Sequence, residues 1–180
     1  MFTIKVSEDI IDHCKNVISK YNFGQRHTAN GTPEQQLTGI IGESIVKQLF
    51  RQRIVTGDGG FDDGVDLVFN ELKIDIKTMG RTTDVRRNYT NNFLKLQDYF
   101  STEIYIFCSY NKRKKQVTIC GWIDKKTFTE RRKYFPKGTA RSRFDGTSFK
   151  TFADLYEIDN HQLFDVNSID ELKLNLNKFK

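Results

Sequence analysis

The stretch GVDLVFNELKIDIKT, residues 64–78, decides how we expect the chain to fold. Its second half, LKIDIKT, alternates apolar with polar residues, and its first half is rich in apolar and β-branched residues, so both halves are typical of strands. Asn70 and Glu71 separate the two runs, and asparagine tolerates the left-handed backbone conformation of a tight turn. The stretch therefore predicts a β-hairpin.

The expected hairpin brings charged residues together on one face, which we expect to be exposed to solvent. Any symmetric two- or four-residue loop centred on Asn70 and Glu71 pairs Asp66 with Asp75, and like charges directly opposite each other destabilise a sheet. A proton, a cationic side chain or a metal ion between the carboxylates removes this repulsion, and Lys77 is the close cation on that face. Two alternatives stay open: a bulge or three-residue loop breaks the register, or the charges form a surface ion-pair cluster.

A helix of residues 33–52 is expected before the hairpin. Thr32 is a capping residue, proline suits the first helical position, and Gln35 completes a capping box. Gly39 and Gly42 lie inside this helix, where each glycine costs up to about 1 kcal/mol relative to alanine. Such residues indicate that a neighbouring backbone approaches the helix closely.

One narrow polar face of the same helix carries Gln36, Gly39 and Glu43, which are spaced by three and four residues. Glu43 can therefore point at the element against which the helix packs. The alternative interpretation of Glu43 is an ordinary exposed glutamate.

The remaining pattern predicts further helices and strands, in a single domain of residues 1–180. The further expected helices are residues 7–20, 93–100, 124–134 and 168–179. The further expected strands are residues 103–110, 116–122 and 152–158. Loops are expected at residues 22–31, 56–64 and 136–147.

Composition is typical of a soluble protein in a cytoplasm, with 37% hydrophobic and 29% charged residues. No apolar run approaches the roughly 18 residues that span a bilayer, and the first residues lack the pattern of a secretory signal, so we expect no membrane association. The three cysteines, Cys14, Cys108 and Cys120, are widely spaced, which favours buried reduced thiols over disulfides or a zinc site.

The net charge of +6 comes from clustered basic residues, and such clusters attract polyanions such as nucleic acid. The alternative for each cluster is a solvated turn or helix face. The three clusters are Arg81, Arg86 and Arg87; residues 112–115; and Arg131, Arg132, Lys133, Lys137, Arg141 and Arg143.

A helix with GIIGE, a strand that begins with Asp66 and a strand with IDIK as D-x-K resemble the PD-(D/E)XK nuclease superfamily in its D-x-K form. The motifs cover residues 36–77, and the order of elements extends the resemblance to residue 122. Val65 stands where the family pattern has proline. The resemblance implies an α/β fold with a central mixed β-sheet flanked by helices. It places a restriction-endonuclease-like core (αβββαβ) over about residues 33–122, and residues 123–180 form an extension of unassigned role.

The resemblance also implies a catalytic site that binds Mg²⁺ or Mn²⁺, because carboxylate and carbonyl oxygens suit these hard cations. Lys77 is expected to orient the attacking water and to stabilise charge. The implied catalytic residues are Glu43, Asp66, Asp75 and Lys77. The implied metal ligands are Asp66, Asp75, the main-chain carbonyl of Ile76, and Glu43. Gln36 and Gln97 are candidates for supporting contacts behind these residues. Candidate phosphate-binding residues are Arg81, Arg86, Arg87, Arg141 and Arg143.

The function implied is a divalent-metal-dependent nuclease that hydrolyses phosphodiester bonds, with a DNA endonuclease favoured. The expected partner is nucleic acid, and a homodimer is compatible with cutting both strands. Two other classes stay open: a catalytically inactive nucleic-acid-binding module on the same fold, and a basic protein-interaction or inhibitory protein.

Overall fold

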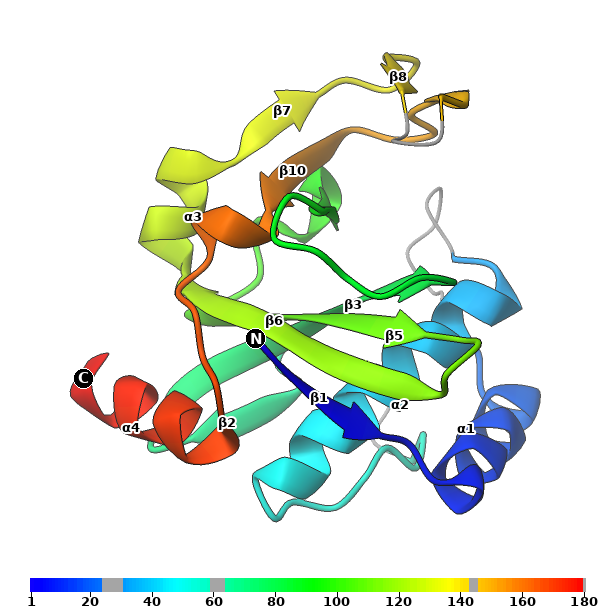
Figure 1. Cartoon of the computed structure of the whole chain (residues 1–180), viewed down its shortest axis with the longest axis vertical. Helices are drawn as coiled ribbons and strands as arrows, with labels where there is room; N and C mark the ends of the chain where they lie inside the picture. The colour runs from blue at the N-terminus through cyan, green and yellow to red at the C-terminus, as the bar shows by residue number, and fades with distance from the viewer. Residues whose placement is uncertain (24–30, 59–63, 143–145, 180) are drawn as a thin grey trace.

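The computed structural model describes residues 1–23, 31–58, 64–142 and 146–179 (Figure 1). The described residues form a mixed α/β fold with a curled mixed sheet and four α-helices, which confirms the expected class. The helices are α1 (Glu8–Lys20), α2 (Pro33–Leu49), α3 (Lys125–Arg131) and α4 (Ile169–Phe179), with short 3-10 helices η1 (Lys95–Gln97) and η2 (Asn160–Gln162). The strands are β1 (Phe2–Lys5), β2 (Leu67–Phe69), β3 (Leu72–Arg81), β4 (Thr90–Leu94), β5 (Ile104–Asn111), β6 (Gln116–Asp124), β7 (Lys133–Phe135), β8 (Ala140–Ser142), β9 (Ser148–Lys150) and β10 (Leu155–Asp159).

In the described residues the strands form a five-stranded sheet of order β1-β6-β5-β3-β2, a three-stranded sheet of order β4-β10-β7, and a hairpin of β8 and β9. Strands β3 and β5 pair in parallel, and the other neighbours pair antiparallel. The hairpin of β2 and β3 therefore extends a sheet in which β3 is an inner strand.

The predicted turn of the hairpin is confirmed. Phe69 pairs with Leu72, so Asn70 and Glu71 form a two-residue loop. Their φ angles are 49° and 67°, and positive φ at both central residues is the backbone of the type I′ turn that suits strand twist.

The predicted start of α2 is also confirmed. The Thr32 hydroxyl accepts a hydrogen bond from the N–H of Gln35, and the Gln35 side chain accepts one from the N–H of Thr32. The helix ends at Leu49, three residues before its expected end, because Arg51 takes a positive φ of 59°.

Several predicted elements were wrong. Residues 93–100 were expected to form a helix, but they hold the end of β4 and the helix η1. Strand β4 pairs with β10, more than 60 residues further along the chain, and local periodicity does not report such distant pairing. Strand β1 was not predicted, and β8 lies in an expected loop.

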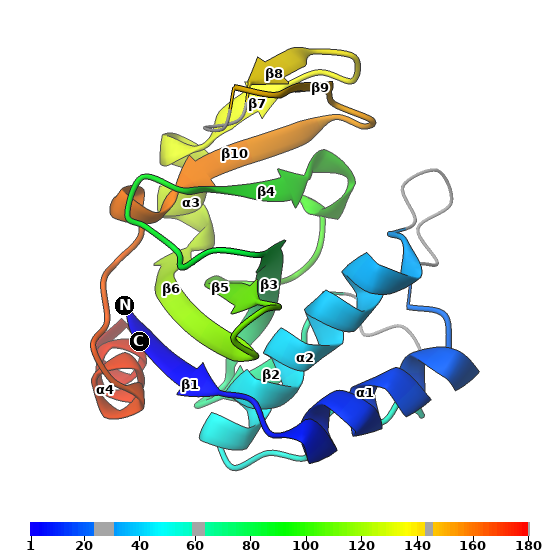
Figure 2. The ribbon, with the colours of Figure 1, turned by 45° about the vertical axis from the view of Figure 1, so that its right-hand side comes forward.

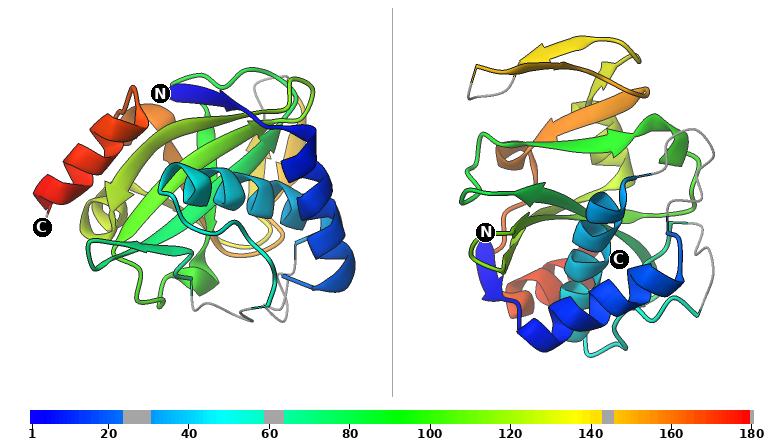
Figure 3. Two further views of the ribbon diagram at one scale, coloured as in Figure 1. Left: turned by 90° about the horizontal axis from the view of Figure 1, so that it is seen from below. Right: turned by 90° about the vertical axis from the view of Figure 1, so that its right-hand side faces the viewer.

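The five-stranded sheet is covered by different layers on its two faces (Figure 2). Helices α1 and α2 lie on one face, and β4 and β10 lie on the other (Figure 3). The core against α2 contains Ile41, Ile45, Ile74, Ile76 and Ile106. The core between the two sheets contains Phe93, Tyr105, Phe107, Phe128 and Ile158. Strand β5 therefore contributes side chains to both interiors.

Helix α2 approaches β3 closely at one of its two glycines. A Cβ atom built on Gly42 would lie 1.9 Å from Thr78 Oγ1, so a larger residue needs the strand to move. A Cβ atom on Gly39 meets nothing within 4 Å. The predicted close approach is confirmed at Gly42 and wrong at Gly39.

Two compositional expectations bear on the structure. Cys14, Cys108 and Cys120 are buried and unbridged, as predicted. Among the residues that the structure describes, no helix is long and apolar enough to cross a membrane.

Candidate active site

The core of the candidate site is an ion pair on β3. Lys77 Nζ lies 2.6 Å from Asp75 Oδ1, and the side chains are only 16% and 2% exposed. Lys77 Nζ also lies 5.5 Å from the ring centroid of Phe93 on β4. We expected the side chains of Asp75 and Lys77 to face solvent, and this prediction was wrong. Both side chains lie on the face of β3 that packs against the second sheet.

The burial of this pair has an energetic consequence. Removing two charges from water costs several kcal/mol per ion, and an apolar pair of similar volume is often equally or more stable. Asp75 therefore lies in the interior at a cost that packing alone does not explain.

Asp66 lies immediately before β2 and contacts the backbone of β3. Its N–H donates to the carbonyl of Ile74 at 2.9 Å, and its Oδ2 accepts from the N–H of Ile76 at 2.6 Å. Leu67 already pairs with Ile74, so two successive residues face one, as in a β-bulge. Asp66 is therefore not placed directly opposite Asp75, but its carboxylate lies at the peptide that joins Asp75 to Ile76.

Glu43 lies on α2, next to the glycine that packs against Thr78. Thr78 and Asp75 differ by an odd number of residues, so their side chains point to opposite faces of the sheet. Glu43 Oε1 instead pairs with Lys47 Nζ at 2.5 Å, one helical turn later. Within the described ranges, no group of three or more His, Cys, Asp or Glu side chains is placed to hold a metal ion.

Tyr105 is a neighbour of Asp75 that the sequence did not single out. It pairs with Asp75 in the parallel register of β3 and β5 and is fully buried. Burial, and then the charge of Asp75, raise the pKa of the Tyr105 hydroxyl, so it stays protonated. Its ring packs against Phe93 and Phe128, with centroids 5.1 and 5.0 Å away. The apolar run in β5 carries no signal that distinguishes Tyr105 from its neighbours.

Arg81, at the end of β3, is bound within the protein. Its guanidinium donates to the carbonyl of Thr90 at 2.7 Å and lies 4.7 Å from the ring centroid of Tyr89. Burial lowers the pKa of this guanidinium. Arg81 therefore joins β3 to β4 and presents little of its charge to a ligand.

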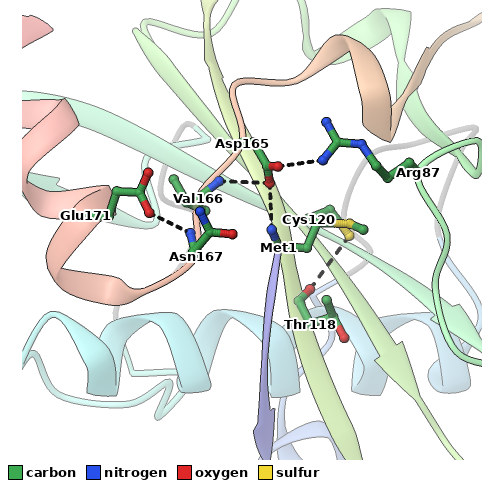
Figure 4. A network of polar contacts seen from close by, with 8 residues as sticks. All are labelled: Met1, Arg87, Thr118, Cys120, Asp165, Val166, Asn167 and Glu171. Atoms are coloured by element: carbon green, nitrogen blue, oxygen red, sulfur yellow. Dashed lines mark hydrogen bonds and ion pairs between the residues drawn. The ribbon is translucent and has the colours of Figure 1, made fainter.

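The two arginines that follow are exposed. Arg87 pairs with Asp165 at 2.5 Å, and Asp165 also accepts a hydrogen bond from the amino group of Met1 at 2.6 Å (Figure 4). The carbonyl of Arg86 accepts a hydrogen bond from Asn160 Nδ2 at 2.8 Å. This segment is held against the region around η2.

Arg141 on β8 forms a bidentate ion pair with Glu157, with distances of 3.1 and 2.5 Å. Its guanidinium carbon lies 4.0 Å from the ring centroid of Phe135. Arg143, the other arginine expected in this loop, lies outside the described residues. The basic turn after β5 is also paired with acids, in Lys112–Glu34, Lys114–Asp84 and Lys115–Glu8.

The contacts of the described residues do not join Gln36 or Gln97 to the ion pair of Asp75 and Lys77. Gln36 Nε2 donates to Asn22 Oδ1 at 3.1 Å and to the carbonyl of Gly31 at 2.9 Å, so it fastens the segment before α2. Gln97 is buried in η1.

A scan against protein-family models, a search of curated proteins and a search of solved structures each found no match. The likeness to the PD-(D/E)XK superfamily is therefore a likeness of sequence motifs and of the order of elements expected from them.

Proposed function

We propose that the protein is a divalent-metal-dependent nuclease that hydrolyses phosphodiester bonds in DNA. One observation carries the proposal: the Asp66 carboxylate binds the N–H of Ile76, the residue between Asp75 and Lys77. This hydrogen bond supports the proposal because it holds the Asp66 carboxylate at the backbone between Asp75 and Lys77, although Asp66 is separated from both by a turn.

The order of elements supports a restriction-endonuclease-like core as part of this proposal. Helix α2 precedes the β2–β3 hairpin, and β5 returns parallel to β3. The connection between β3 and β5 contains β4 and η1, where the family pattern has a helix. The central hairpin and its covering helix match the pattern, and the crossover departs from it.

The carboxylates of Asp66 and Asp75 suit a magnesium or manganese ion in chemical type. Mg²⁺ is commonly bound by one or two carboxylates, and waters and substrate phosphate complete its octahedral shell. When bound, such an ion neutralises charge on the phosphate and activates water. Glu43 and the carbonyl of Ile76 stay predicted further ligands, and Glu43 lies on the α2 side in this arrangement.

The chain's own residues have separate roles in this proposal. Asp66 and Asp75 hold hard oxygen donors on either side of one peptide. Lys77 is the more exposed member of the ion pair, so its ammonium group meets the phosphate and orients water. A cation beside aromatic rings acts in a low local dielectric, where its effect on developing negative charge is larger than in water.

The test is cleavage of supercoiled plasmid DNA with Mg²⁺ or Mn²⁺. Asp66→Asn keeps an oxygen that can accept from the N–H of Ile76 but removes the charge. Because a bound metal contributes several kcal/mol to such chemistry, we expect a loss of at least about a hundredfold in rate. Asp12→Asn, at an exposed acid on α1, is the matched control and should cleave like wild type.

Equal cleavage by wild type and Asp66→Asn overturns the proposal, as does the absence of metal-dependent cleavage on DNA and RNA. The second outcome favours the inactive nucleic-acid-binding module.

A further inference from the structure

A hollow of about 460 Å³ lies beside the second sheet, and its lining includes neither member of the β3 ion pair. Its volume is within the range of about 300 to 1,000 Å³ that is typical of small-molecule sites. It is lined by residues of η1 and of the segments on either side of β8 and β9: Lys95, Leu96, Lys137, Phe152, Ala153 and Asp154.

Exposed aromatic side chains gather at this hollow. Phe152 lines it and is 57% exposed, although an aromatic ring of this size is usually buried. Tyr134 is also exposed, and its hydroxyl donates to Asp154 Oδ2 at 2.9 Å. A flat apolar ring therefore faces solvent at the hollow, and a second exposed aromatic residue binds Asp154 in its lining through its hydroxyl.

Positive charge borders the same hollow. Lys95 Nζ lies 4.7 Å from the ring centroid of Tyr134 and 3.8 Å from Asp154 Oδ2, and Lys137 is exposed. Asp154 is the acid at this place, and its carboxylate accepts from the N–H of Lys137 and the hydroxyl of Tyr134. These hydrogen bonds lower the pKa of Asp154, so the carboxylate organises the rim of the hollow as an anion.

We propose that this hollow binds an unpaired stretch of a DNA strand, with a base stacked on Phe152 and the adjacent phosphates at Lys95 and Lys137. Aromatic platforms between lysines are the means by which proteins hold single strands, because every base has a face that can stack. A duplex does not offer such a face, since its bases are already stacked. The inference rests on the proposed function, because it takes nucleic acid as the partner.

The test is fluorescence anisotropy with a labelled oligothymidylate and with a duplex of equal length, in EDTA so that no cleavage occurs. We expect Phe152→Leu to weaken single-strand binding by about tenfold, since stacking contributes about 1 to 3 kcal/mol per base. Duplex binding should change by less than about twofold. Phe179→Leu is the matched control, because Phe179 on α4 is 44% exposed and lies outside the hollow.

A salt titration gives a second readout. Lys137→Gln removes one phosphate contact, so the slope of log affinity against log salt for the oligothymidylate should fall by about 0.7. The inference is overturned if wild type does not bind the oligothymidylate, if Phe152→Leu binds it normally, or if Phe152→Leu loses duplex binding equally. Single-strand binding that depends on Phe152, without cleavage, overturns the nuclease proposal alone.

Discussion

The two faces of β3 are built on different principles. On one face Ile74, Ile76 and Thr78 pack under α2, and the strand lies so close to the helix that only glycine fits at position 42. On the other face, Asp75 and Lys77 lie as an ion pair near the ring of Phe93. Hydrophobic packing accounts for the first face. The second face carries a desolvation cost that packing does not offset, and this cost is one reason why we propose a functional site there.

The largest expected loss of stability comes from breaking the ion pair on the charged face of β3. Lys77→Met removes the cation that Asp75 contacts and should lower the free energy of unfolding by about 3 kcal/mol or more, because breaking one side of a buried ion pair is strongly destabilising. Urea unfolding measures this loss. The double variant Asp75→Asn with Lys77→Met should recover most of it, since no buried charge of the pair then remains. A loss below about 1 kcal/mol in the single variant contradicts the electrostatic interpretation.

On the packed face of β3, a larger residue in α2 should destabilise the protein by crowding the strand. Gly42→Ala forces a Cβ atom into Thr78 Oγ1 and should destabilise the protein by about 2 to 3 kcal/mol, as overpacking of a tight core does. Thr78→Ala in the same chain should relieve part of the clash, because it removes Oγ1 and Cγ2 but keeps Cβ. Thermal unfolding of the three variants checks this coupling.

Gly39→Ala, in the same helix, should change the free energy of unfolding in the opposite direction. A Cβ atom at Gly39 meets nothing within 4 Å, and alanine is favoured over glycine inside a helix by up to about 1 kcal/mol. We therefore expect a small gain in unfolding free energy. Destabilisation by this substitution contradicts the packing of α2 described above.

Local signals in the sequence predicted the elements that depend on neighbouring residues. Thr32 and Gln35 predicted the start of α2, and Asn70 predicted the turn of the hairpin, because caps and turns are decided within a few residues. The parity of Asp75 and Lys77 was predicted correctly, but their burial was not. That burial depends on β4, which pairs with β10 far along the chain.

The structure brings together only some of the predicted site residues, for the same reason. Asp66 meets the backbone of β3 because both belong to one hairpin, whereas Glu43 depends on how α2 crosses the sheet. No pattern in the sequence distinguishes a helix face that points at a site from one that points beside it. The ion pairs of Arg87 and Arg141 with distant acids could not be predicted for the same physical reason.

The smallest expected effect on stability comes from Asp165, whose ion pairs are exposed, in contrast to the buried pair of Asp75 and Lys77. Contacts with the amino group of Met1 and with Arg87 lower the pKa of Asp165 from its ordinary 3.8 to about 2 (Figure 4). The folded pKa lies below the unfolded one, so this stabilisation is present above about pH 4 and is lost as the pH falls toward 2. Asp165 is 39% exposed, and solvent screening limits the contribution to less than about 1 kcal/mol. Asp165→Asn should make the free energy of unfolding, measured with urea, depend less on pH over this range. An unchanged pH dependence contradicts the contribution assigned to Asp165.

The most direct test of the proposed metal site is Mn²⁺ binding, monitored through the electron paramagnetic resonance signal of the free ion. Wild type should bind Mn²⁺, and Asp66→Asn should bind it at least about tenfold more weakly, as loss of a group at a metal site typically does. Asp12→Asn should bind like wild type. Equal Mn²⁺ affinity in wild type and Asp66→Asn contradicts a metal site at the peptide between Asp75 and Ile76.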